Sequence, residues 1–246
     1  MTDRTVLKIS GSDRESFLQG LVTNDIARLK DGLVYAALLT PQGKYLADFF
    51  MVPADDAILI DVATSLAKSL AQRLSMYKLR ADVAIEATEI TPALGLGDTP
   101  DGAFADPRHP ELGWRAYDGR DGETRVDWKA LHVAHLIPQT GIELTPDTYI
   151  LESGFERLNG VDFKKGCYVG QEVTARMKHK TELKKGLALV SIDGAAPAGA
   201  PITRDGKPVG TLFTQSGGQA IAYLRFDRAG TGMKADDAEV SWSAQA

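Results

Sequence analysis

Two apolar runs separated by a short turn sequence constrain the fold of this chain more than any other feature. Residues 33–40 and 45–52 are mostly apolar, and Pro41-Gln42-Gly43-Lys44 lies between them. Proline fixes its own φ and glycine tolerates positive φ, a combination that is typical of tight turns between strands. The sequence therefore predicts a β-hairpin here.

The patterns on either side of this hairpin predict a layered α+β structure. Alternating residues predict strands over 5–10, 57–62 and 83–85. Ser12-Asp13-Arg14-Glu15 has the form of a capping box that opens a helix. A second helix begins near Ser65 and carries Leu66, Leu70 and Leu74 on one stripe. The order of these elements predicts a ferredoxin-like split βαβ layer.

The sequence pattern changes twice in the rest of the chain, first after residue 90 and again after Gly186. Proline, glycine and aspartate are frequent over residues 91–124, which predicts loops around short strands at 93–96 and 114–117. A helix is expected over 127–137 and irregular structure over 145–160. After Gly186, short strand patterns recur at 187–192, 201–203, 208–214, 219–224 and 238–242. This spacing predicts a small antiparallel barrel.

Composition excludes several classes of protein. Of the 246 residues, 43% are hydrophobic and 25% charged, so the chain can form a core and is not a disordered protein. The net charge of −5 argues against a surface that binds nucleic acid or acidic membranes as a whole. The longest apolar runs have the length of a strand, and no export signal is recognisable, so we expect a soluble cytoplasmic protein.

The single cysteine, Cys167, lies in the most unusual segment of the chain. One cysteine cannot form an internal disulfide, and an iron-sulfur cluster bound here would need further ligands from outside. The segment reads Lys164-Lys165-Gly166-Cys167-Tyr168-Val169-Gly170-Gln171-Glu172 and precedes an expected helix from Gln171 to about His179. A thiol beside ammonium groups and near a helix start is favoured in its reactive form. A buried, inert cysteine beside two turn-forming glycines is about as probable on these residues alone.

The same region is strongly basic. Residues 164–185 carry seven basic and two acidic residues. They could hold a ligand with a carboxylate or phosphate, or an acidic partner, and Arg176 is suited to bidentate pairing. A solvated helix face explains the same run of charges. His132 and His135 stand three residues apart on the expected third helix, but no further ligand completes a metal site.

Several distinctive motifs occur in order along the chain. They are Phe17-Leu18-Gln19-Gly20, Thr23-Asn24-Asp25, Leu39-Thr40-Pro41-Gln42-Gly43-Lys44, the segment 165–172 with Ala175-Arg176, Gly206-Lys207-Pro208-Val209-Gly210 and Ala222-Tyr223-Leu224-Arg225. Together these motifs resemble the YgfZ family, which is related to the glycine-cleavage T-protein, an aminomethyltransferase. They are spread from near residue 13 to near residue 227, so the resemblance covers most of the chain.

The resemblance implies a fold and a function. It implies an α+β, aminomethyltransferase-like, folate-binding region over residues 1–185 and a C-terminal β-barrel over 186–246. It further implies an accessory factor that binds tetrahydrofolate and supports iron-sulfur proteins, including [4Fe-4S] radical enzymes that modify tRNA. The expected partners are folate and iron-sulfur client or assembly proteins, with no direct nucleic acid and no membrane. No established turnover goes with the family.

The resemblance also assigns site residues. Cys167 and Asp48 are the candidate catalytic residues. The candidate cofactor-binding residues are Lys165, Gly166, Tyr168, Gly170, Gln171, Glu172 and Arg176, and no metal site is expected. The T-protein carries paired carboxylates where this chain has Ala47 and Asp48, so general-base catalysis of aminomethyl transfer loses one group. A folate-dependent one-carbon transferase or demethylase that uses Asp48 is the alternative, and a protein-binding module with a buried cysteine is a third interpretation.

Overall fold

The computed structural model describes residues 3–179 and 182–243 of the chain. It contains two compact units, each built from two separate stretches. The first combines Met1–Val126 with Phe155–Ala175, and the second combines Asp127–Gly154 with Arg176–Ala246. Residues 127–154 therefore pack with the C-terminal strands. The functional division between residues 185 and 186 stays a prediction.

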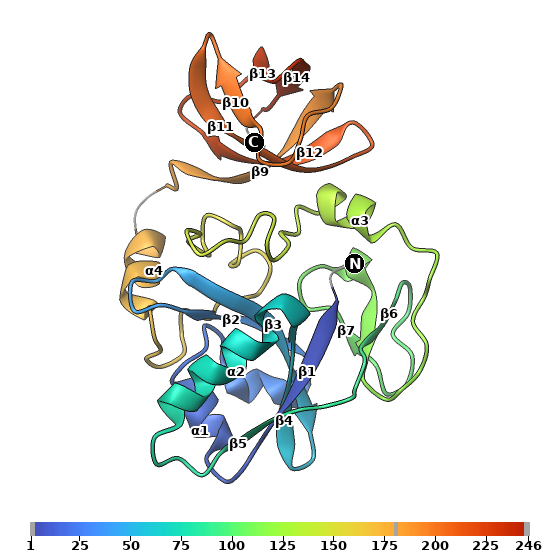
Figure 1. The fold of residues 1–246 in the computed structure, drawn as a ribbon, viewed down its shortest axis with the longest axis vertical. Helices are drawn as coiled ribbons and strands as arrows, with labels where there is room; N and C mark the ends of the chain where they lie inside the picture. The colour runs from blue at the N-terminus through green and yellow to red at the C-terminus, as the bar shows by residue number, and fades with distance from the viewer. Residues whose placement is uncertain (1–2, 180–181, 244–246) are drawn as a thin grey trace. The chain divides into compact units, whose positions relative to one another are not determined.

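A five-stranded antiparallel sheet forms the centre of the first unit (Figure 1). Its strands are β1 (Arg4–Ser10), β2 (Val34–Leu39), β3 (Tyr45–Ala54), β4 (Ala57–Ala63) and β5 (Ala84–Ala87), in the order β2-β3-β4-β1-β5. Helix α2 (Thr64–Lys78) leads from β4 to β5, and β1 pairs antiparallel with both strands. The predicted hairpin and split βαβ arrangement are both confirmed.

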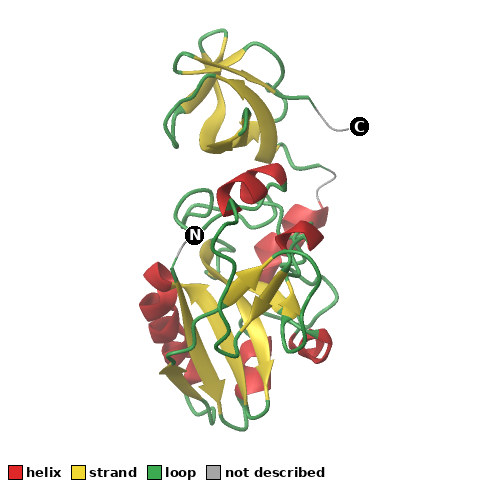
Figure 2. Cartoon of the chain, turned by 90° about the vertical axis from the view of Figure 1, so that its right-hand side faces the viewer, coloured by secondary structure: helices red, strands yellow, loops and turns green. Residues whose placement is uncertain are grey.

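The two faces of this sheet have different chemistry. Ala47, Phe49 and Met51 of β3 pack into an apolar core together with Leu70 and Leu74 of α2. The short helices α1 (Arg14–Gln19) and η1 (Ile26–Asp31) contribute Leu18 and Ile26 to the same core. Figure 2 shows these helices beside the sheet. Because side chains alternate along a strand, Asp48 and Phe50 lie on the opposite face.

The expected capping box does not form. Asp13 is the N-cap residue of α1, but its side chain makes no capping hydrogen bond. Instead Asp13 Oδ2 accepts the backbone N–H of Asp82, and the Ser12 hydroxyl donates to Asp82 Oδ2. These contacts with the segment before β5 replace the local bonds on which the prediction depended.

A small second sheet completes the first unit. It contains β6 (Ala93–Gly95), β7 (Phe104–Ala105) and β8 (Trp114–Ala116) in the order β6-β8-β7, with the short helix η2 (Pro110–Leu112) before β8. Strands β6 and β8 confirm the predictions for 93–96 and 114–117. Strand β7 was not predicted, because its two residues are too short for any periodicity.

The second unit contains a closed antiparallel barrel, as predicted (Figure 1). Its strands are β9 (Lys185–Asp193), β10 (Pro201–Arg204), β11 (Lys207–Ser216), β12 (Gln219–Arg225), β13 (Met233–Ala235) and β14 (Ala238–Ser241). Helix α3 (Trp128–Ala134) contacts β11 and β12. The buried carboxylate of Glu143 accepts hydrogen bonds from the hydroxyl and the N–H of Thr214, which ties the segment after α3 to the barrel. None of the described helices is long and apolar enough to cross a membrane.

Candidate functional site

The side chain of Asp162 fixes the start of the loop that carries Cys167. Asp162 Oδ1 accepts the backbone N–H groups of Lys164 at 2.7 Å and Lys165 at 3.2 Å. Asp162 Oδ2 pairs with Arg28 at 2.9 Å. A short polar side chain that bonds backbone groups two and three residues ahead stabilises a tight turn. The loop therefore leaves Asp162 in one fixed direction.

Lys165 points into the protein rather than toward a ligand. Its Nζ donates to the backbone carbonyls of Gln19 at 2.8 Å, Val22 at 2.6 Å and Asn24 at 3.0 Å. Burial lowers the pKa of Lys165 to about 8. An ammonium group has three hydrogens, and these three carbonyls use all of them. The expected role of Lys165 in cofactor binding stays a prediction, and a ligand would have to compete with these bonds.

The bonds of Lys165 explain why distant motifs occur together in this sequence. Gln19 accepts the N–H of Ile26 through its side chain, which closes the segment that offers the three carbonyls. Asn24 Nδ2 donates to the carbonyls of Tyr35 and Asn159. The segment that contains the motifs at 17–20 and 23–25 therefore binds the side chain of Lys165.

Beyond Lys165 the loop returns to the surface and then enters the protein again. Gly166 is exposed, and a Cβ on it would have no neighbour within 4 Å; Cys167 is exposed as well. Tyr168 is buried, its ring centroid lies 5.1 Å from Lys165 Nζ, and burial raises its pKa. The exposed thiol is thus held between two buried side chains. This arrangement differs from the buried, inert cysteine of the alternative interpretation.

Gly170 fixes the other end of the loop against the β2–β3 turn. Its φ is +85°, and a Cβ on it would lie 2.6 Å from the carbonyl oxygen of Thr40. Gly43 in the turn has a φ of +74°, and a Cβ there would lie 2.8 Å from Cβ of Val173. Only glycine permits this approach without displacement of the backbone. The turn motif and the cysteine motif are therefore one packed structure.

Helix α4 (Gln171–His179), predicted over the same residues, begins at this contact. Gln171 is half-buried, and Glu172 and Arg176 are exposed. Within residues 3–179 and 182–243, no hydrogen bond or ion pair engages the side chains of Glu172 and Arg176. Their charges face solvent near the thiol loop, where they could meet a partner.

Asp48 has different surroundings from Cys167, because it is buried on the face of the sheet opposite the apolar core. The hydroxyl of Tyr45 donates to Asp48 Oδ1 at 2.6 Å, and that of Tyr35 donates to Oδ2 at 3.0 Å. Burial, and then the charge of Asp48, raise the pKa of Tyr35 well above its ordinary value, so this phenol stays protonated and donates. Ala47 belongs to the opposite core, so a carboxylate at position 47 would not lie beside Asp48.

A buried network of charges next to Asp48 was missed by sequence reasoning. Asp106 pairs with Arg108 at 2.8 Å and with Arg115 at 3.0 Å. Arg115 also pairs with Asp61, at 3.2 Å, and Asp61 pairs with Arg4 at 2.6 Å. Burial alone would raise the pKa of Asp106, but Arg108 and Arg115 outweigh it and hold that pKa well below its usual range.

This network and Asp48 are joined through aromatic rings. The guanidinium carbons of Arg115 and Arg108 lie 3.9 Å and 4.8 Å from the ring centroid of Phe50. The ring of Tyr35 lies 5.3 Å from that of Phe50 and 5.1 Å from that of Phe155. Only the segment Asp106-Pro107-Arg108 offered a sequence signal, namely opposite charges two residues apart. In the described part of the chain, no group of three or more His, Cys, Asp or Glu side chains is placed to hold a metal ion.

Comparison with known proteins matches both parts of the chain. A family model described as the CAF17 C-terminal β-barrel domain matches residues 184–246. The mouse protein "Iron-sulfur cluster assembly factor IBA57, mitochondrial" is 28% identical, and the match covers 90% of this chain and 75% of that protein. A Neurospora crassa homologue of IBA57 is 30% identical over 80% of this chain, which spans 54% of the longer protein.

Among solved structures, the aminomethyltransferase T of the glycine cleavage system from Bartonella henselae has the same fold. The TM-score is 0.72, the match covers 98% of this chain and 83% of that one, and the sequences are 14% identical. At this identity the likeness concerns the fold alone. The barrel match, the relatives over most of the chain and the shared fold agree with one another: the chain is similar to the IBA57 proteins over most of its length and to CAF17 in its C-terminal barrel.

Proposed function

We propose that this protein is an assembly factor for iron-sulfur proteins and that Cys167 is its working residue. The relatives named as iron-sulfur cluster assembly factors support the proposal. The observation that carries it is the exposed thiol on a loop fixed by Lys165, Tyr168 and Gly170. A thiol that only filled space in a core would not be presented to solvent in this way.

The exposed position favours a chemical role for Cys167 over a role in ordering the loop. Lys165 and Tyr168 already hold the loop without help from the thiol. A cluster normally takes four thiolates or equivalent ligands. In our proposal Cys167 acts in one of two ways. It is either one ligand of a cluster whose other ligands come from a client or assembly partner, or a redox-active thiol next to that cluster. The exposed Glu172 and Arg176 beside the loop would contact that partner.

We further propose that a reduced folate binds to this protein. The fold shared with an aminomethyltransferase supports this, and the chemistry of Asp48 is compatible with it. A carboxylate has about four lone-pair sites, so one that accepts tyrosine hydroxyls has the chemistry to accept N–H groups of a pterin ring as well.

[4Fe-4S] radical enzymes that modify tRNA are the proposed clients, and the cytoplasm is the proposed location.

A folate-dependent one-carbon transferase is the second candidate function, and the buried Asp48 favours it. A positioned carboxylate can act as a general base, and two tyrosine hydroxyls fix the orientation of this one. Turnover of a methylated amine with tetrahydrofolate, lost in Asp48→Asn, would support this function.

Complementation tests the main proposal. Cells without this protein are supplied with the wild type, with Cys167→Ser or with Lys68→Gln, a change on the exposed face of α2 outside the cysteine loop, at equal abundance. We expect the wild type and Lys68→Gln to restore the activity of a [4Fe-4S] enzyme and Cys167→Ser to fail. Restoration by all three proteins would remove Cys167 from the mechanism. Titration calorimetry with tetrahydrofolate on the wild type and Asp48→Asn tests the ligand separately.

A further inference from the structure

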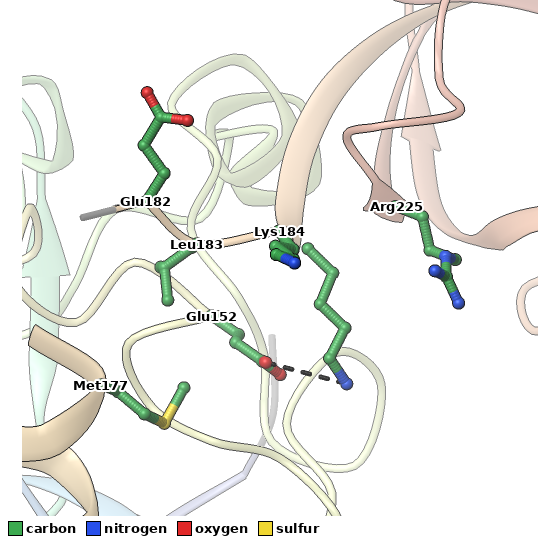
Figure 3. Close-up of a pocket in the computed structure, with 7 residues that line it drawn as sticks. Glu152, Met177, Glu182, Leu183, Lys184 and Arg225 are labelled. Atoms are coloured by element: carbon green, nitrogen blue, oxygen red, sulfur yellow. Dashed lines mark ion pairs between the residues drawn. The ribbon is translucent and has the colours of Figure 1, made fainter. Parts of the chain in front are cut away.

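A pocket of about 370 Å³ lies within the second unit, at the start of the barrel (Figure 3). It is lined by Glu152, Met177, Glu182, Leu183, Lys184, Lys185 and Arg225. The volume lies at the small end of the range found for ligand pockets, which is roughly 300–1,000 Å³. A site of this size suits a small molecule.

The floor of the pocket is rigid because Glu152 is fixed on several sides. Its carbonyl oxygen accepts the N–H of Leu187 at 2.7 Å, and a Cβ on Gly186 would lie 2.8 Å from that oxygen. Its carboxylate accepts the hydroxyl of Tyr223 at 2.6 Å. Burial, and then the bond to Glu152, raise the pKa of Tyr223, so the phenol remains a donor.

The charges that line the pocket do not cancel. Lys185 lies 3.7 Å from the carboxylate of Glu152, so these two charges offset each other. In Figure 3, the carboxylate of Glu182 points away from Glu152. Within residues 3–179 and 182–243, no carboxylate lies within ion-pair distance of Lys184. Among the residues that the structure describes, Arg225 forms an ion pair only with Asp227, at 3.6 Å, and both side chains are about half exposed.

The opposite wall is apolar. Figure 3 shows Met177 of α4 and Leu183 pointing toward Glu152. Methionine is flexible and adapts to ligands of different shape. The pocket thus combines an apolar wall with two cations: Lys184, which has no ion-pair partner among the described residues, and Arg225, which pairs with the half-exposed Asp227.

We propose that this pocket binds a small organic anion. The charged group of the ligand lies against Lys184 and Arg225, and its apolar part packs on Met177 and Leu183. Glu152 holds Lys185 in place and excludes ligands that carry a second negative charge deep in the pocket. The proposal concerns the second unit alone and does not depend on cluster assembly or on folate.

The fluorescent anion 8-anilinonaphthalene-1-sulfonate tests the proposal on the full chain. We expect one saturable site, with affinity about tenfold weaker in the double variant Lys184→Gln/Arg225→Gln, because two exposed ion contacts are lost. The double variant Lys207→Gln/Lys234→Gln removes the same charge from exposed barrel residues outside the pocket and should bind as the wild type does. The neutral dye N-phenyl-1-naphthylamine should bind more weakly and respond to neither change.

A second readout locates the bound dye. The sulfonate should protect Lys184 and Lys185, but not Lys207, from acetylation as measured by mass spectrometry. Equal affinity in the two double variants, or equally tight binding of the neutral dye, would overturn the proposal. Protection that is absent at Lys184 would overturn it as well, since the dye would then lie elsewhere.

Discussion

Gly43 and Gly170 meet backbone to backbone: a Cβ on Gly170 would lie 3.2 Å from Cα of Gly43. This contact joins the turn of the β2–β3 hairpin to the start of α4. It therefore connects the rigid sheet to the loop that presents Cys167. A side chain at either position would separate the two segments.

Replacement of Gly170 by alanine should destabilise the protein by about 3 kcal/mol, since left-handed strain and overpacking add to each other. The new Cβ would meet the carbonyl oxygen of Thr40 at 2.6 Å, at a φ of +85°. Urea unfolding measures the change. Gly166→Ala in the same loop is the control, because its Cβ would have no neighbour within 4 Å. Equal effects of the two substitutions would contradict this account of the contact.

Replacement of Lys165 by methionine should destabilise the protein by about 2 kcal/mol, because three carbonyls, two of them in buried bonds, lose their donor while the cost of burying an ammonium is removed. These carbonyls belong to Gln19, Val22 and Asn24. The exposed neighbour provides the matched control Lys164→Met, which should leave the free energy of unfolding nearly unchanged. A loss of stability in Lys164→Met as large as in Lys165→Met would show that the three hydrogen bonds of Lys165 are not the source of the effect.

The stability that Lys165 contributes should rise with pH. Burial lowers the pKa of Lys165 to about 8 from its ordinary value of 10.5. Between these two values the unfolded chain binds more protons than the folded chain, so the free energy of unfolding increases with pH across this window. The difference between the wild type and Lys165→Met should therefore be larger at about pH 10 than at about pH 7.5. A difference that shrinks over this range would contradict the assignment.

Replacement of Asp106 by asparagine should destabilise the protein by about 3–5 kcal/mol, because Arg108 and Arg115 would remain buried without their shared carboxylate. Asp118→Asn breaks the exposed pair with Arg120 and should have only a small effect. The arginines hold the pKa of Asp106 below its usual range, so its contribution is lost as the pH falls below about 4. Thermal unfolding at neutral and acid pH compares the three proteins.

Replacement of Cys167 by serine should change stability by less than about 0.5 kcal/mol, as expected for an exposed side chain. Tyr168→Ala, which removes a buried ring from the same loop, should cost about 3 kcal/mol. The melting temperatures of the two variants give the comparison. If Cys167→Ser were as unstable as Tyr168→Ala, the thiol would serve to order the loop.

Local patterns predicted much of this fold, because each depends on residues close in sequence. The turn at Gly43 predicted the hairpin, and the stripe of Leu70 and Leu74 predicted α2. The capping box failed because Ser12 and Asp13 bond to Asp82, which is distant along the chain. Strand β13 is only three residues long and had no detectable period.

The site was predicted less completely than the fold. The sequence indicated Cys167 through its neighbours, but not that Lys165 turns inward, because both lysines of the pair look alike in one sequence. The pairing of Arg115 with Asp61 joins residues 54 positions apart, and no single sequence records such a partnership. Charged side chains are usually exposed, and a single sequence does not mark the few that are buried together.

The bond from Lys165 to the carbonyl of Val22 spans 143 residues. During synthesis on the ribosome, the carbonyls around Val22 emerge long before the lysine that satisfies them. The first unit is therefore incomplete until its second stretch has been translated, and the cysteine loop is among the last parts of that unit to be made. The segments that hold the cysteine loop are thus made before the loop itself, and the loop can take up its position only when both Lys165 and Gly170 have been translated.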